Sequence, residues 1–522
     1  MDVLQQWKQG VVYPRWAALS HWGYGEARFI FYPPVSWTLG AALGAILPWK
    51  MVPAAYCWII ITAAALSMYK LARGWLPPSD ALFAAVFYAL NPYHLLIVYW
   101  RSAYGELLAA IILPLMLLYM LRLVDAGPRP MLWLSFTLAA AWLFNIPAAL
   151  MIHYSAAGLA LFISLRERSS RPLIKTAAAV LLGVGLASFF LIPAIYEQPW
   201  VNISAILSPG VRPVDNFLFT TLDDPDHNRF NLLVSLVASA EIAVFVISIW
   251  FVRRKQHENS SNGLLLFLWG AAIVFVMFPV SNVLWEHLPE FRFIQLPFRW
   301  LLCLGIPLTI LFTLATAQGP QSFPANSSSP DRRSSIRRWS ARVFVLTLLI
   351  ATVVISGRYT QPPWWDNASD IKEMSDAISD GTGYEGSDEY VPIGGDPYEL
   401  NKALPQVSDG IDSAANTQIL EWSALEKHFT MRSTTPQNLT VRLFNYPAWK
   451  VTVNGKPVEA QSSDVTGLIV VPVPAGNSDV RIVFRRTFDC LAGTIVSLFC
   501  LALCIFLLAR LSIRSRPAGI TP

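Results

Sequence analysis

Long apolar segments alternate with short polar ones along most of this chain. Segments of roughly 20 apolar residues, the length that crosses a bilayer as a helix, recur as far as residue 509. We place them at 52–70, 81–100, 106–124, 131–146, 148–165, 176–195, 230–251, 263–281, 299–316, 342–357 and 488–509. A shorter apolar segment, 35–49, follows Pro33-Pro34. The pattern predicts an α-helical polytopic membrane protein with about 11 spans.

Clusters of Lys and Arg follow every second apolar segment and predict the orientation of the chain. They are Lys70 and Arg73; Arg122 and Arg129; Arg166, Arg168, Arg171 and Lys175; Arg253, Arg254 and Lys255; Arg332, Arg333, Arg337, Arg338 and Arg342; and Arg510, Arg514 and Arg516. Because basic loops stay in the cytoplasm, these clusters are assigned to the inside. The first loop is then outside only if 35–49 is a juxtamembrane helix that does not cross. If 35–49 crosses, that loop is cytoplasmic.

The same orientation divides the chain into parts. We expect an extracytoplasmic aromatic loop with the juxtamembrane helix (1–51), a transmembrane bundle (52–316), a cytoplasmic linker (317–341), a transmembrane helix (342–357), an extracytoplasmic β-rich domain (358–487), a C-terminal transmembrane helix (488–509) and a cytoplasmic tail (510–522). The linker is rich in Ser, Pro and Arg and has no periodicity, which is typical of a disordered connector.

The β-rich domain shows the alternation of half-buried strands. The alternating segments are 439–444, 451–453, 468–473 and 480–484, and Asn454-Gly455 between two of them is a strong hairpin signal. The pattern predicts a small antiparallel β-sandwich, and we expect 405–487 to fold alone. Such a domain can bind sugars or can act as a structural spacer, since fold does not establish function.

Composition agrees with a membrane protein and excludes several soluble classes. The 522 residues are 54% hydrophobic and only 14% charged, so the net charge of +5 reports orientation in the membrane and not nucleic-acid binding. The five cysteines lie in or beside apolar segments, and no zinc, redox or disulfide pattern is visible. We assign no cofactor, although a divalent metal stays compatible with the acidic residues.

Ionisable residues gather at the predicted outer ends of the spans, where they are costly unless they are paired or functional. The aromatic stretch 13–34 suits a membrane surface, because Trp and Tyr favour the headgroup level; the alternative is an aromatic belt with incidental charges. Several arginines beside carboxylates can clamp a phosphate while a base deprotonates an acceptor hydroxyl. The candidates are Glu26 and Glu106 as catalytic carboxylates, and Arg15, His21, Arg28, His94, Arg101 and Arg299 as phosphate or substrate ligands.

Several short motifs resemble a bacterial family of multi-spanning proteins that are labelled 6-pyruvoyl-tetrahydropterin synthase-related. The motifs are Tyr13-Pro14-Arg15-Trp16, Gly23-Tyr24-Gly25, Phe31-Tyr32-Pro33-Pro34, Asn91-Pro92-Tyr93-His94 with Tyr99, Arg101 and Glu106, Gln295-Leu296-Pro297-Phe298-Arg299, Tyr384 with Asp388, Glu389, Tyr390 and Pro392, and Tyr446-Pro447 with Trp449. That family in turn resembles the GT-C glycosyltransferases, which take a sugar from a polyprenyl-phosphate carrier at the outer membrane face. The resemblance implies a location in the bacterial inner membrane.

The resemblance also implies some cautions about chemistry. A pterin synthase of that type holds zinc with histidines, whereas the seven histidines here are scattered without ligand spacing, so we expect no such activity. Related proteins have a first membrane helix and an acidic residue before the segment that matches Tyr13-Pro14-Arg15-Trp16. Here only 1–12 precede it. Either the chain starts late, or it lacks the base, or Glu26 takes that role.

Two functions stay open at this point. The first is a membrane glycosyltransferase that moves a sugar from a polyprenyl-phosphate carrier to a cell-envelope acceptor. The second is a non-catalytic envelope scaffold or a transporter whose β-domain holds a glycan or a partner. Membrane lipids are the expected partners, nucleic acid is not, and no oligomeric state is assigned. A lipid-sized groove favours the enzyme, and a continuous polar path through the bundle favours transport.

Overall fold

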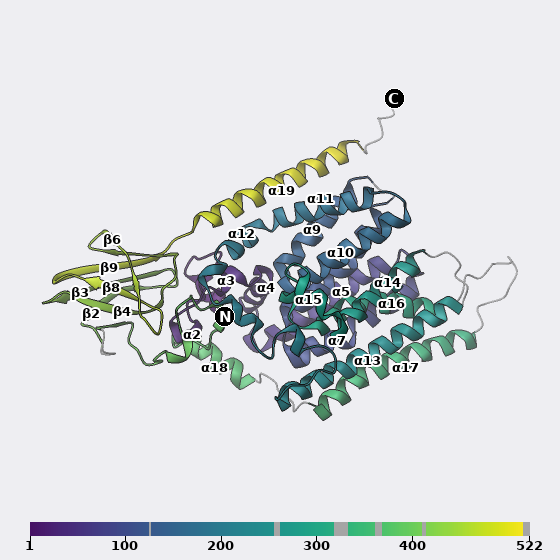
Figure 1. Ribbon diagram of the computed structural model, residues 1–522, viewed down its shortest axis with the longest axis horizontal. Helices are drawn as coiled ribbons and strands as arrows, with labels where there is room; N and C mark the ends of the chain where they lie inside the picture. The colour runs from purple at the N-terminus through teal and green to yellow at the C-terminus, as the bar shows by residue number, and fades with distance from the viewer. Residues whose placement is uncertain (125–126, 255–260, 318–331, 361–367, 410–413, 515–522) are drawn as a thin grey trace. The chain divides into compact units, whose positions relative to one another are not determined.

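The computed structural model describes residues 1–124, 127–254, 261–317, 332–360, 368–409 and 414–514 (Figure 1). Two compact units form. The β unit contains Met1–Pro53, Ala187–Ile206 and Asp366–Phe499, and the helical unit contains Ala54–Leu186, Leu207–Trp365 and Cys500–Pro522. Each unit is therefore assembled from segments that are far apart in the sequence.

The helical unit consists of long apolar helices joined by short turns. Its first part contains α5 (Val52–Ala72), α6 (Pro78–Ala89), α7 (Pro92–Leu96), the π-helix η2 (Ile97–Arg101), α8 (Tyr104–Arg122), α9 (Arg129–Phe144), α10 (Ile146–Arg166) and α11 (Arg171–Leu186). Its second part contains η5 (Pro213–Asp215), α13 (Pro225–Arg254), α14 (Ser261–Val276), η6 (Pro279–Ser281), α15 (Asn282–His287), η7 (Phe291–Ile294), η8 (Pro297–Trp300), α16 (Leu301–Thr316) and α17 (Arg332–Thr360).

Local sequence explains where these helices begin. Asn91 caps α7 by accepting a hydrogen bond from the Tyr93 amide at 2.8 Å, and Asn145 caps α10 by accepting one from the Ala148 amide at 2.9 Å. Pro92 occupies the first position of α7 and Pro147 the second position of α10. The missing N–H of proline costs nothing there, because the first amides of a helix have no partner within it. Each cap thus starts a new helix directly after the preceding one ends, although the sequence stays apolar.

Eight helices of the described chain are long and apolar enough to cross a membrane, and up to ten if each of two bent pairs counts as one span. The predicted segments 176–195 and 263–281 belong to these pairs, which bend by 75° and 94°. The predicted span 131–146 is α9, whose 16 residues are fewer than the 18 that we require of a spanning helix. The helical multi-pass architecture is confirmed, while the predicted continuity of the two bent spans is wrong.

Three predicted boundaries also change. The helix expected at 342–357 runs over Arg332–Thr360, so residues 332–341 of the predicted linker 317–341 are helical, and residues 318–331 lie outside the described part. Helix α19 (Phe488–Arg514) extends into the predicted tail 510–522, of which 515–522 also lie outside. The segment 35–49 contains α4 (Pro34–Gly44), whose 11 residues make a helix of about 16 Å, roughly half the hydrocarbon thickness.

The β unit contains two antiparallel sheets. The strands are β1 (Val407–Ser408), β2 (Thr417–Trp422), β3 (Glu426–Ser433), β4 (Gln437–Phe444), β5 (Trp449–Val453), β6 (Lys456–Val458), β7 (Gln461–Ser462), β8 (Leu468–Val473) and β9 (Gly476–Phe484). One sheet has the order β1-β4-β8-β7 and the other β2-β3-β9-β5-β6. Asn454 and Gly455 both have positive φ and join β5 to β6, as the hairpin signal predicted. The predicted C-terminal β-domain is therefore confirmed as a sheet domain.

Helical segments complete the β unit. They are α1 (Asp2–Lys8), α2 (Ser20–Gly23), α3 (Arg28–Phe31), α4, η1 (Trp49–Met51), α12 (Ser188–Tyr196), η3 (Gln198–Trp200), η4 (Ile203–Leu207), α18 (Ala368–Ser379), η9 (Asp388–Tyr390), η10 (Pro397–Glu399) and the first part of α19.

The aromatic stretch near the N-terminus packs into the core of the β unit. Trp16 and Tyr24 are fully buried, and the Trp16 ring lies 5.6 Å from that of Trp449 and 5.5 Å from that of Tyr446. Gly25 has a φ of +75°, and a Cβ there would lie 2.1 Å from Trp16 Nε1, so only glycine fits. Trp16 and Tyr24 therefore belong to the core of the β unit, whereas Trp22 is half-buried and Tyr32 is 37% exposed, and the membrane-surface loop stays a prediction for the stretch as a whole.

This shared core generates a prediction about stability. Trp16→Ala should lower the free energy of unfolding of the β unit by about 3–5 kcal/mol, because it leaves a large cavity in the core. Pulse proteolysis of the full chain in urea measures this, with Tyr398→Ala, at a side chain that is 82% exposed, as the control.

The isolated fragment 405–487 lacks Trp16, Tyr24 and Phe31 and should show no cooperative thermal transition, contrary to the expectation from sequence. A fragment that unfolds cooperatively, together with a Trp16→Ala chain that resists urea as the parent does, would contradict the shared core.

Candidate functional site

The helical unit holds an arginine cluster, which we define as Tyr93, Arg101, Glu106 and Arg299. The Glu106 carboxylate is 1% exposed and lies 2.8 Å from Arg101 Nη1 and 3.2 Å from Arg299 Nε. Tyr93 donates to Glu106 Oε1 at 2.6 Å and accepts from Arg101 Nη1 at 2.9 Å. Two guanidiniums thus share one carboxylate, which leaves an excess of positive charge around Glu106.

Irregular backbone brings these side chains together. Arg101 ends the π-helix η2, and Ser102 follows with a φ of +47°, so the chain turns before Glu106 in the first turn of α8. Arg299 lies in η8, where it also donates to the Ile294 carbonyl at 2.7 Å and to Gln295 Oε1 at 3.0 Å. Single-turn π-helices of this kind are frequent at functional sites.

A second acidic residue, Glu241 of α13, contacts the start of helix α7, which carries Tyr93. It accepts from the Tyr93 amide at 3.1 Å and from Asn91 Nδ2 at 3.4 Å, and it is fully buried. The sequence interpretation missed Glu241, although it is the one acidic residue in the apolar segment 230–251 and an ionisable residue inside a span is a functional candidate by default.

The β unit holds a separate glutamate cluster, which we define as His21, Glu26 and Arg28. Glu26 is fully buried and lies 2.9 Å from His21 Nε2 and 2.5 Å from Arg28 Nε. It also accepts from the Ser20 hydroxyl at 3.1 Å and from the Ser387 amide at 2.8 Å. Both carboxylate oxygens are therefore engaged by protein donors.

Backbone conformation fixes this cluster against the segment 384–390. His21 and Trp22 have φ values of +50° and +56°, and the Trp22 amide donates to the Tyr384 carbonyl at 3.0 Å. A Cβ at Gly386 would lie 2.0 Å from His21 Nε2, so glycine is required there. The glutamate cluster joins the first loop to a segment more than 350 residues away, as the 359-residue separation of Arg28 and Ser387 shows.

The two remaining predicted ligands lie outside both clusters. The Arg15 guanidinium lies 5.6 Å from the centre of the Tyr13 ring, and the buried His94 ring packs at 4.9 Å against Tyr88. The sequence predicted that all eight candidates meet on one face. Within the helical unit Arg101, Glu106 and Arg299 meet, and within the β unit His21, Glu26 and Arg28 meet, while a single face shared by all eight stays a prediction.

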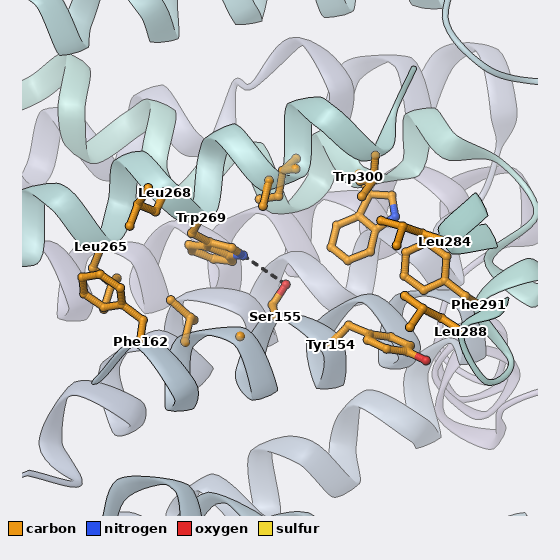
Figure 2. Close-up of a pocket in the computed structure, with 15 residues that line it drawn as sticks. Tyr154, Ser155, Phe162, Leu265, Leu268, Trp269, Leu284, Leu288, Phe291 and Trp300 are labelled. Carbon is orange, nitrogen blue, oxygen red and sulfur yellow. Dashed lines mark hydrogen bonds between the residues drawn. The ribbon is translucent and has the colours of Figure 1, made fainter. Parts of the chain in front are cut away.

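An apolar cavity of about 270 Å³ lies in the helical unit (Figure 2). Figure 2 shows Phe162 and Leu265 at one end and Trp300 and Phe291 at the other, with α10 and α14 forming the long walls. Between the ends, Trp269 Nε1 donates to the Ser155 hydroxyl at 3.1 Å. Trp300 directly follows Arg299 in η8, so one end of the cavity and the arginine cluster share a single 3₁₀ turn.

A third buried group lies in the β unit. Among the described residues, one group of three potential metal ligands is close enough to hold an ion, with ligand atoms within 4.8 Å of one another: Glu197, Asp489 and Cys490. Glu197 also accepts hydrogen bonds from the Tyr446 and Thr487 hydroxyls. Burial raises the pKa of Glu197 from 4.5 to about 7, and the nearby Asp489 adds to that shift while the two hydroxyls oppose it.

The raised pKa of Glu197 predicts a pH-dependent stability. A carboxyl that is protonated more readily in the fold stabilises it fully below pH 4.5, and that contribution is lost as the pH rises through about 7. The melting temperature of the parent minus that of Glu197→Gln should decrease as the pH rises from 4.5 to about 7, and it should stay constant at higher pH. Glu399→Gln, at an exposed residue of η10, should give no such slope.

The same experiment distinguishes a proton from a metal at this group. If EDTA lowers the melting temperature of the parent and not that of Glu197→Gln, the three side chains hold an ion, and the interpretation of Glu197 as a neutral acid fails.

Comparison with known proteins agrees with the membrane architecture. The family model described as "6-pyruvoyl-tetrahydropterin synthase related domain; membrane protein" matches residues 29–360, which is more than half of the chain. That range contains the whole arginine cluster and the apolar cavity. No curated protein matches the sequence. The chain therefore belongs to the 6-pyruvoyl-tetrahydropterin synthase related family of membrane proteins.

Proposed function

We propose that this chain is a membrane glycosyltransferase that moves a sugar from a polyprenyl-phosphate carrier to a cell-envelope acceptor. The observation that carries the proposal is the arginine cluster beside the end of an apolar cavity, since a prenyl lipid combines an apolar tail with an anionic head. Arg101 and Arg299 offer planar donor forks that match phosphate oxygens. The family name contributes nothing to the proposal, because the histidines lack the spacing of a zinc site.

The charges of the cluster suit the leaving group of such a reaction. Sugar transfer forms a bond between the acceptor oxygen and the anomeric carbon and breaks the bond between that carbon and a phosphate oxygen. The electron pair stays on the phosphate, which also takes up the proton of the acceptor hydroxyl. Guanidiniums already oriented by Glu106 and Tyr93 stabilise that developing charge without reorganising. A bound phosphate would also complete the charge balance of the two arginines.

The two candidate catalytic carboxylates have positioning roles in this proposal. Glu106 and Glu26 each pair with arginine, so both carboxylates are already engaged by cations of the protein. Glu106 orients Arg101 and Arg299. Glu26 orients His21 and Arg28.

The proposed topology places the β unit outside the cytoplasm. Residues around Trp16, Val201 and Val407 share one core, so these segments lie on the same side of the membrane, and an even number of crossings must separate them. Six crossings lie between Trp16 and Val201 if α9 is counted with α5, α6–η2, α8, α10 and the bent pair α11–α12, and six is an even number. Helix α9 spans about 24 Å, so it can cross, and the chain then has the 11 spans expected from sequence.

Carrier binding in detergent tests the proposed function. Arg101→Lys or Arg299→Lys keeps the charge but loses the two-donor fork, which removes about 1.5–3 kcal/mol, so a polyprenyl phosphate should bind roughly tenfold or more weakly. Glu106→Gln keeps the shape of the side chain but removes the charge that orients both arginines, so it should also weaken phosphate binding. The matched control is Arg342→Lys, because Arg342 is a fully buried arginine that pairs with Asp80 at 2.8 Å.

The lipid tail is tested in the same assay. Gly158 lines the cavity, and a Cβ added to it would meet no other atom within 4 Å, so Gly158→Leu fills the cavity without a backbone clash. This variant should weaken both polyprenol and polyprenyl phosphate, whereas the arginine variants should weaken only the phosphate. If the parent binds no carrier, or if both Lys variants lose stability and keep carrier affinity, the scaffold interpretation replaces this proposal.

Cysteine labelling of intact cells tests the topology. Val12→Cys and Tyr398→Cys, at side chains 86% and 82% exposed, should both react with a membrane-impermeant maleimide. Gly127→Cys, exposed beside Arg129 in a predicted cytoplasmic turn, should react only after permeabilisation. Opposite accessibility of Val12 and Tyr398 would contradict the shared side, and protection of both would reverse the orientation.

A further inference from the structure

A second cavity, of about 280 Å³, lies within the β unit and differs in character from the apolar one. Its walls come from helix α1, the loop that follows it, the end of α18, and strands β2 to β4. The volume is slightly below the roughly 300–1,000 Å³ of pockets for drug-sized ligands, so a small ligand or a single unit of a larger one fits.

The lining combines hydrogen-bonding groups of both kinds with one aromatic ring. Gln5 and Gln6 contribute amides from α1 and Gln9 contributes one directly after it. Arg442 contributes a guanidinium from β4, and Trp422 ends β2. Gln9 Oε1 already accepts from the Ala424 amide at 3.1 Å, which fixes α1 beside the turn between β2 and β3. The walls are therefore polar and held in place.

Three buried polar atoms on lining residues have no hydrogen-bond partner within the described chain. They are Gln5 Oε1, Gln6 Oε1 and Arg442 Nε, two acceptors and one donor. Leaving a buried polar atom unsatisfied is unfavourable, so three beside one cavity point to a partner that the cavity accommodates. A partner that both donates and accepts satisfies all three.

The charges around this cavity are balanced. Asp2 and Asp380 face Lys427 and Arg442 among the lining residues. Arg442 is further engaged by the carbonyls of Leu404 and Lys402, at 3.0 and 3.2 Å. Burial lowers the pKa of Lys427 from 10.5 to about 7 and raises the pKa of Asp2, so charge of both signs is reduced around the cavity. The cavity therefore lacks the surplus of cations that a phosphate needs.

We propose that this cavity binds a neutral saccharide unit. A sugar ring offers hydroxyls that donate and accept at once, which match the three unsatisfied atoms, and an apolar face that stacks on an aromatic side chain such as Trp422. An apolar ligand would leave the amides unpaired, and a phosphate would meet two carboxylates. The inference rests on this cavity alone and stands whether or not the chain transfers a sugar.

Saturation-transfer NMR on the full chain tests the proposal, in a detergent without a sugar head group. The probes are neutral methyl glycosides of glucose, galactose, mannose and N-acetylglucosamine, with inorganic phosphate as the anionic comparison. At least one glycoside should bind, and Gln5→Met should weaken it at least tenfold, because this substitution keeps the shape of the side chain and removes its amide.

Two further variants keep the result interpretable. Trp422→Phe retains an aromatic ring with less stacking area and should also weaken binding, whereas Trp58→Ala, at a 71% exposed side chain of α5, should not. The melting temperature of each variant shows whether it folds. Binding of phosphate in place of the glycosides overturns the proposal, and so does the absence of any glycoside with a Kd below about 10 mM.

Discussion

The Glu106 carboxylate holds two arginines from distant segments of the helical unit in one buried cluster. A charge inside a membrane protein is costly without a partner, so Arg101 and Arg299 can lie there only because Glu106 and Tyr93 meet them. The π-helix before Arg101 and the 3₁₀ turn around Arg299 are the backbone adjustments that make this meeting possible. The same turn carries Trp300 to the cavity wall, so charge pairing and the apolar cavity are parts of one arrangement.

The β unit depends on a different constraint, which is the filling of its core by residues distant in sequence. Trp16 and Tyr24 complete a core that is otherwise built by the sheets. The loop that contains both residues is held by the glutamate cluster, because Glu26 accepts a hydrogen bond from the Ser387 amide. This explains why motifs near residues 13–34 and 384–392 occur together in the sequence. They are two sides of one interface within the unit.

Much of the fold follows from local signals, and the rest depends on long-range packing. Hydrophobic length predicted the spanning helices, and alternation predicted β4, β5, β8 and β9. The alternation signal missed β3, because Lys427 occupies a buried position of that strand and interrupts the apolar pattern. The bend between α11 and α12 was also missed, since the apolar run continues through it without a break.

The candidate site was predicted in its residue types but not in its grouping. Arg101, Glu106 and Arg299 meet as expected, whereas Glu26 and Arg28 belong to another unit. Burial of the aromatic stretch could not be read from composition, because the same rings suit a membrane surface and a protein core equally well. The packing of the Trp16 ring against Tyr446 and Trp449 places that ring in a protein core.

A cryo-EM map of the chain with a polyprenyl phosphate tests most directly the claim that the arginine cluster and the apolar cavity form one lipid-binding site. The account predicts tail density between α10 and α14 and a phosphate within hydrogen-bond distance of Arg101 or Arg299. An empty cavity, or a carrier bound with its phosphate away from both arginines, would contradict it.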